Sequence, residues 1–190
     1  MRVFISWSGE TRHKVAQILY DWLLKLEIPS LELYISDEID KGAVWFADLI
    51  SELKKADCGI LCLTKENVNA PWLLFEAGAL LTAKERSFLA PFLFRVNRSE
   101  IAGPLAQFQH TEFARDDIKS FVRRLNKSCG ENALSQENLT NAFERMYPEL
   151  EERLRTVPKP DDEFPENSPL DENLLELLRN MKKQLDSMMP

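Results

Sequence analysis

Residues 57–64 read Asp-Cys-Gly-Ile-Leu-Cys-Leu-Thr, a nearly continuous apolar run bounded by polar side chains. Such a run is typical of a strand with both faces covered, as in the interior of a parallel sheet. Further strands are predicted at 3–6, at 31–35, where apolar and polar residues alternate, and at 91–96, with Pro91 at the start. A short edge strand is predicted within 107–113. Cys58 and Cys62, inside the central run, are expected to be buried, reduced thiols.

Helical patterns separate these strands. Apolar residues recur at helical spacing over 15–26, and further helices are predicted at 45–56, from Pro71 onward, and at 117–126 with Asp116 as a cap. This alternation indicates βαβ units, and five strands favour an α/β, flavodoxin-like, doubly wound parallel sheet in the order 2-1-3-4-5. Ligands bind such sheets beyond the carboxyl ends of the strands, where the order reverses between strands 1 and 3.

The end of the chain is predicted to be a helical extension. Residues 135–156 have a helical pattern, interrupted at Pro148, that would cover one flank of the sheet. We expect a domain over 1–156, a proline-rich acidic linker over 157–169, and an amphipathic helix over 170–190. The apolar seam of that helix spans barely more than two heptads. This favours docking back on the domain or weak dimerisation over a dedicated coiled coil.

Composition narrows the possible partners. The formal net charge of −7, without any dense run of Lys and Arg, argues against nucleic-acid binding. No signal peptide is recognisable, and no uncharged apolar run reaches the roughly 18 residues of a membrane span, so a cytoplasmic protein is expected. Three cysteines argue against a disulfide framework. His13 and His110 are isolated, and no spacing predicts a metal site.

Glu76 is the only charge in the apolar run from Pro71 to Ala83. Trp72 and Glu76 are four positions apart, so a helix places them on one face, a turn apart. Because desolvating a carboxylate costs several kcal/mol without a partner, Glu76 either reaches the surface or lies in a pocket that uses its charge. Its helix follows the third strand, which puts it near the predicted ligand site.

Three blocks on this predicted site face resemble a Toll/interleukin-1 receptor (TIR) domain of the bacterial type. They are the first strand and its turn at 4–8, the loop 37–42 running into Trp45, and the pair Trp72 and Glu76. The resemblance covers about residues 1–155 and implies a flavodoxin-like fold. The enzymatic members of the family cleave NAD at the nicotinamide–ribose bond.

Carried over to matching positions, the resemblance makes Glu76 the catalytic glutamate and Trp72 its companion. The residues expected to bind substrate are Ser6, Trp7, Ser8, Arg12, Asp37, Lys41, Gly42, Trp45 and Trp72. NAD would be the substrate, with no separate cofactor and no metal.

The residue types suit this chemistry. Nicotinamide leaves as a neutral molecule and needs no general acid, so one carboxylate can stabilise the oxocarbenium ion. Trp7 or Trp45 would stack on a base, backbone N–H groups of the turn at 6–9 would hold the diphosphate, and Arg12 or Lys41 would add positive charge.

Other interpretations stay open. The chain is alternatively a non-catalytic TIR adaptor that acts by domain assembly, or a nucleoside 2-deoxyribosyltransferase-like enzyme. Glu76 and the acidic loop 37–40 are alternatively solvated, and Trp72 a core anchor.

The resemblance further implies switching by self-association and a bacterial antiphage role, with an upstream activator or a downstream product sensor. The product would be linear ADP-ribose or a cyclic isomer.

Overall fold

The computed structural model describes residues 1–7, 10–35, 51–52, 54–65, 67–68 and 88–158. Residues 51–52 and 54–55 are helical, in agreement with the end of the helix predicted at 45–56. Ala56 is not helical, and residues 45–50 and 53 lie outside the described residues. So do the helix predicted from Pro71, the linker beyond Pro158 and the amphipathic helix at 170–190.

Five parallel strands form one sheet in the order β2-β1-β3-β4-β5, which confirms the predicted fold class and strand order. The strands are β1 (Arg2–Ser6), β2 (Glu32–Ile35), β3 (Cys58–Leu63), β4 (Phe88–Leu93) and β5 (Thr111–Glu112). Every residue of the central strand β3 is buried, as its apolar sequence predicts. Cys58 and Cys62 are buried free thiols, and burial raises the pKa of Cys58 far above its usual value.

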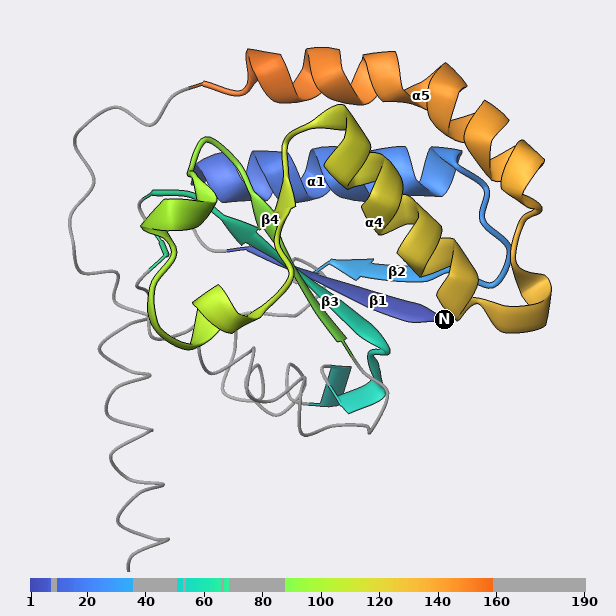
Figure 1. The fold of residues 1–190 in the computed structure, drawn as a ribbon, viewed down its shortest axis with the longest axis horizontal. Coiled ribbons are helices and arrows are strands. Elements are labelled where there is room, and N and C mark those ends of the chain that lie inside the picture. The colour runs from blue at the N-terminus through green and yellow to red at the C-terminus, as the bar shows by residue number, and fades with distance from the viewer. Residues whose placement is uncertain (8–9, 36–50, 53, 66, 69–87, 159–190) are drawn as a thin grey trace, which may run out of the picture.

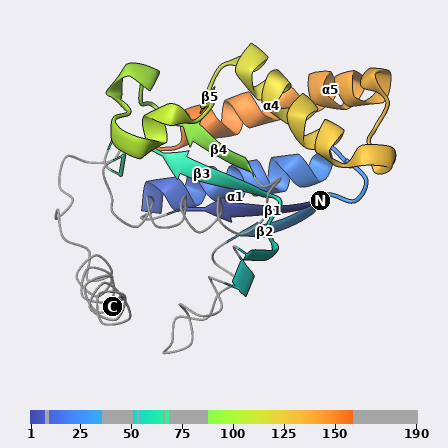
Figure 2. The ribbon, with the colours of Figure 1, turned by 60° about the horizontal axis from the view of Figure 1, so that its bottom comes forward.

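Helices α1 (Glu10–Lys25), α4 (Arg115–Ser128) and α5 (Gln136–Thr156) all lie on one face of the sheet, with α5 outermost (Figure 1). The core of this face includes Ile5, Ile60 and Phe92 from the strands. Turning the molecule shows the helical residues 51–52 and 54–55 on the opposite face (Figure 2). The core there joins Phe4, Leu61 and other strand residues to the segment that follows β4. Alternate residues of β1, β3 and β4 therefore serve two cores.

Strand β4 begins earlier than predicted, so Pro91 lies inside the strand and not at its start. The N–H groups of Phe88 and Phe94 both donate toward β3, to Asp57 O (3.2 Å) and Leu63 O (2.8 Å). Alternation therefore turns the nitrogen of Pro91 to the other side, where β5 pairs only with Phe92 and later residues. The missing N–H of Pro91 thus falls on a stretch of the strand edge where no described strand pairs with it, and such a position tolerates proline.

The predicted interruption of the last helix at Pro148 is wrong, because α5 runs continuously through it. Pro148 is exposed, whereas its neighbours Tyr147 and Leu150 are buried. Pro148 has no N–H to donate to the carbonyl four residues earlier in the helix. That carbonyl therefore faces solvent, while packing holds the helix on either side. The predicted cap of α4 is also wrong: Ala114 is the N-cap residue, and Asp116 lies in the first turn.

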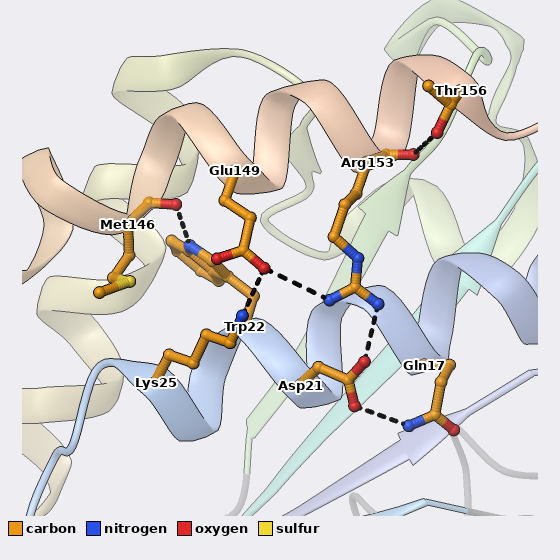
Figure 3. Close-up of polar contacts among 8 residues, drawn as sticks. All are labelled: Gln17, Asp21, Trp22, Lys25, Met146, Glu149, Arg153 and Thr156. Atoms are coloured by element: carbon orange, nitrogen blue, oxygen red, sulfur yellow. Dashed lines mark hydrogen bonds and ion pairs between the residues drawn. The ribbon is translucent and has the colours of Figure 1, made fainter.

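Side-chain contacts attach α5 to α1 (Figure 3). The indole N–H of Trp22 donates to the main-chain carbonyl of Met146 (2.9 Å), and Arg153 pairs with Asp21 (2.7 Å). Lys25 forms a further ion pair with Glu149. The extension is therefore packed on the domain, as predicted for the flank of the sheet. None of the helices among the described residues is long and apolar enough to cross a membrane.

Candidate functional site

The strand order reverses between β1 and β3, and polar side chains gather where these two neighbours end. Ser6 is the last residue of β1, is fully buried, and pairs in register with Leu61. Thr64 follows β3 directly and is also buried. In a doubly wound sheet this is the edge at which ligands bind, so the topology places the candidate site here.

A buried asparagine shapes the loop after β3. Asn67, which is 1% exposed, accepts a hydrogen bond from Thr64 N through Oδ1 (2.8 Å) and donates through Nδ2 to Cys62 O (3.0 Å). Its own N–H donates to Thr64 O (3.2 Å). Both ends of its amide are thus satisfied, and the loop is held in one turn against the end of β3.

Arg12, in the first turn of α1, reaches across to this loop. Its Nη1 donates to Oγ1 of Thr64 at 3.4 Å, a long hydrogen bond between residues 52 positions apart. The N-terminal end of α1 lies at the same edge, because the helix begins soon after β1 ends. A guanidinium and a helix N-terminus both favour a negatively charged ligand.

Trp7 follows β1 and lies against His13 of α1, with ring centroids 4.3 Å apart and planes inclined by 32°. It also packs on the hydrophobic core of the α1 face. Its Nε1 atom is buried and finds no hydrogen-bond partner in the part of the chain that the structure describes. A buried donor without an acceptor is uncommon, since leaving one unpaired costs about 1–3 kcal/mol.

The structure brings together three of the predicted site residues, Ser6, Trp7 and Arg12. The others lie outside the described residues: Ser8, Asp37, Lys41, Gly42, Trp45, Trp72 and Glu76.

The sequence alone does not single out Thr64, Asn67 or His13 as candidate site residues. The signal available for Asn67 was its place three positions after the polar end of a strand, where its side chain can form a turn. Over the described ranges no group of three or more His, Cys, Asp or Glu side chains is arranged to hold a metal ion.

Comparison with known proteins gives one family. A family model described as "TIR domain" matches residues 3–126, from β1 into α4. No curated protein matches the chain.

Several solved structures are similar at low identity. The TIR domains of an activated Roq1 resistosome that directly recognises the pathogen effector XopQ are 15% identical, over 93% of this chain and 98% of that one, with a TM-score of 0.45. An azoreductase from Bacillus anthracis str. Sterne is 9% identical over 80% and 98%, with a TM-score of 0.37. A flavodoxin from the domain Archaea is 8% identical over 81% and 97%, with a TM-score of 0.35. At these scores the three structures do not bear on the site.

Proposed function

Because the chain belongs to the TIR domain family, we propose that it cleaves NAD at the nicotinamide–ribose bond, releasing nicotinamide and either ADP-ribose or a cyclic isomer. The observation that supports this most is the contact of Arg12 with Thr64 at the carboxyl ends of β1 and β3. It puts a fixed positive charge beside a helix N-terminus, where the diphosphate of a dinucleotide would need it.

The proposed reaction breaks the C–N bond between ribose and nicotinamide. The bonding electrons go to the pyridinium ring, so nicotinamide leaves neutral, and the ribose becomes an oxocarbenium ion. We assign Glu76 to stabilise that cation, after which water, or a nucleophilic nitrogen of the same molecule, attacks it and loses its proton where it has one. A single carboxylate suffices because the leaving group needs no protonation.

The described residues have separate roles in this proposal. Arg12 binds the diphosphate, and the turn after Ser6 approaches it with backbone N–H groups. Asn67 keeps Thr64 in place to receive Arg12. Trp72, Trp45 and the loop containing Asp37, Lys41 and Gly42 complete the pocket in the proposal, as the family resemblance implies.

The test is chromatography of the products after incubation with NAD and, separately, with 2′-deoxynucleosides. We expect nicotinamide from NAD and no free base from the deoxynucleosides; the reverse result would assign the chain to the deoxyribosyltransferase-like class. Arg12→Ala should raise KM for NAD more than it lowers kcat. Arg123→Ala, which removes an exposed arginine of α4, is the matched control and should change neither.

We further propose that self-association switches the activity on, in a bacterial antiphage response. The rate of nicotinamide release per molecule should then rise with protein concentration. A non-catalytic adaptor would instead associate without releasing nicotinamide at any concentration, and that outcome would replace the enzymatic proposal.

A further inference from the structure

We propose that Trp7 holds the substrate through its indole N–H, which donates to a diphosphate oxygen, and not through the face of its ring. This inference rests on the proposed function and adds to it a specific contact. It changes the expected role of Trp7, which the sequence alone presents as a stacking platform.

The indole N–H of Trp7 has no acceptor among the described residues. Trp7 Nε1 is buried and unpaired there, whereas Nε1 of Trp22 donates to Met146 O. Of these two indoles, the described residues therefore supply an acceptor only for that of Trp22. An unpaired donor at the ligand edge of the sheet becomes satisfied when a ligand brings an acceptor.

Other side chains cover part of the Trp7 ring. The imidazole of His13 lies 4.3 Å from the Trp7 ring centroid and is inclined by only 32°, so it covers one face. The ring also packs on the core that includes the α1 helix. Protein contacts thus take up much of the stacking surface, and the polar edge is the part of Trp7 without a described partner.

The groups near Trp7 indicate the kind of acceptor. Trp7 contacts His13 and Arg12 donates to Thr64, so two consecutive residues at the start of α1 make contacts with the residues that follow β1 and β3. A guanidinium, a helix N-terminus and an indole N–H all favour the same acceptor, an anionic oxygen. The diphosphate is the anionic part of NAD, whereas the carboxamide of nicotinamide is neutral.

Nuclear magnetic resonance of the indole groups observes this contact directly. The chain has four tryptophans and so gives four indole ¹H–¹⁵N signals, with that of Trp7 assigned by its loss in Trp7→Phe. We expect the free protein to show the Trp7 proton at the high field of an unbonded indole, and ADP-ribose to move it to lower field. The Trp22 signal, already hydrogen-bonded, is the internal reference and should stay in place.

Titration with nicotinamide riboside, which lacks the diphosphate, identifies the acceptor. The assignment predicts no low-field shift of the Trp7 proton with this probe. A shift with nicotinamide riboside but not with ADP-ribose would overturn the assignment, as would a Trp7 proton already at low field in the free protein.

Kinetics provide a second readout. Trp7→Phe keeps an aromatic ring and removes only the donor, so KM for NAD should rise roughly tenfold to a hundredfold while kcat changes little. Trp22→Phe is the matched control: it removes a satisfied donor far from the substrate and should lower stability without raising KM. If the wild type cleaves NAD and Trp7→Phe has an unchanged KM, this assignment alone fails. If the wild type neither binds nor cleaves NAD, the proposed function fails and this assignment fails with it.

Discussion

The indole N–H of Trp22 in α1 donates to the main-chain carbonyl of Met146 in α5, across 124 residues of sequence (Figure 3). Trp22 is 1% exposed and meets Phe143 of α5 edge to face, with ring centroids 6.1 Å apart. The family match ends at residue 126, before α5 begins. The core of the α1 face therefore extends beyond the matched region, and α5 is part of the same packed unit.

Truncation should show that folding requires α5 but not the residues that follow it. A chain ending at residue 134 exposes Trp22 and the other side chains that α5 covers, so we expect aggregation or loss of cooperative unfolding. A chain ending at Pro158 keeps every described contact of α5 and should melt cooperatively. Thermal unfolding followed by circular dichroism measures both. A shorter chain that melts like the longer one would show that α5 is dispensable for folding.

The mass of the chain ending at Pro158, measured by light scattering, tests the predicted role of the C-terminal segment in association. If the truncated and full chains contain the same number of copies per particle, residues 159–190 are ruled out as the oligomerising element.

Acid should weaken the attachment of α5 through Asp21. Burial alone would raise the pKa of Asp21, but hydrogen bonds from Arg153 and Gln17, with nearby positive charge, lower it overall. A lowered pKa means that the stabilisation is present above the unfolded value of about 4 and is lost as pH falls through the folded value. Because the pair is about one-third exposed, Asp21→Asn should cost only about 0.5–1 kcal/mol at neutral pH.

The difference in unfolding free energy between wild type and Asp21→Asn, measured by urea titration, should shrink toward zero as pH falls below about 4. A difference that stays constant down to acid pH would mean that the carboxylate contributes nothing to the attachment of α5.

Arg95 binds the carbonyl groups that follow the C-terminal end of α5, and it does so from an unfavourable backbone conformation. Its φ is 56°, and its guanidinium donates to Val157 O (2.7 Å) and Pro158 O (3.0 Å). Arg95→Ala loses these hydrogen bonds and keeps the strained φ, so we expect a loss of about 1–2 kcal/mol. Arg95→Gly should be about 1 kcal/mol less harmful, because glycine adopts positive φ freely.

Ser30→Gly is the control for the backbone effect, since Ser30 has a φ of 61°. It should stabilise the protein by about 1 kcal/mol in denaturant unfolding. Equal losses for Arg95→Ala and Arg95→Gly would show that backbone strain at this position is negligible.

Two buried asparagines allow a matched test of the site. Asn67 ties the loop after β3, and Asn126 makes an equivalent pair of hydrogen bonds with Leu134 N (2.8 Å) and Leu134 O (2.9 Å) at the end of α4. Substitution of either by alanine should cost about 1–3 kcal/mol of stability. Only Asn67→Ala should also raise KM for NAD, because it frees Thr64 from its position against Arg12.

Both variants are compared at a temperature where each is fully folded, by thermal melts and steady-state nicotinamide release. Parallel kinetic losses in the two would mean that Asn67 acts through general stability and does not position the site.

The fold was accessible to sequence reasoning because its signals are local. The apolar run over β3, the alternation of strands and helices, and the short connections fix the topology. Two of the misses share one cause: Pro91 and Pro148 are tolerated because of which side of the strand or helix they face, and that depends on neighbours distant in sequence. The candidate site was likewise predictable only in part. Ser6, Trp7 and Arg12 could be proposed from their positions after the first strand of the sequence. The hydrogen bonds of Asn67 and the unpaired N–H of Trp7 become visible only once burial and distances are known.

The proposed catalysis by Glu76 is tested by nicotinamide release from NAD at high protein concentration, with wild type, Glu76→Gln and the control Glu151→Gln side by side. Glu151 pairs with Arg155 on the surface of α5 and is not among the candidate site residues, so its variant should match the wild type. We predict release by the wild type and by Glu151→Gln, and none by folded Glu76→Gln. Release by Glu76→Gln at the wild-type rate would contradict the account.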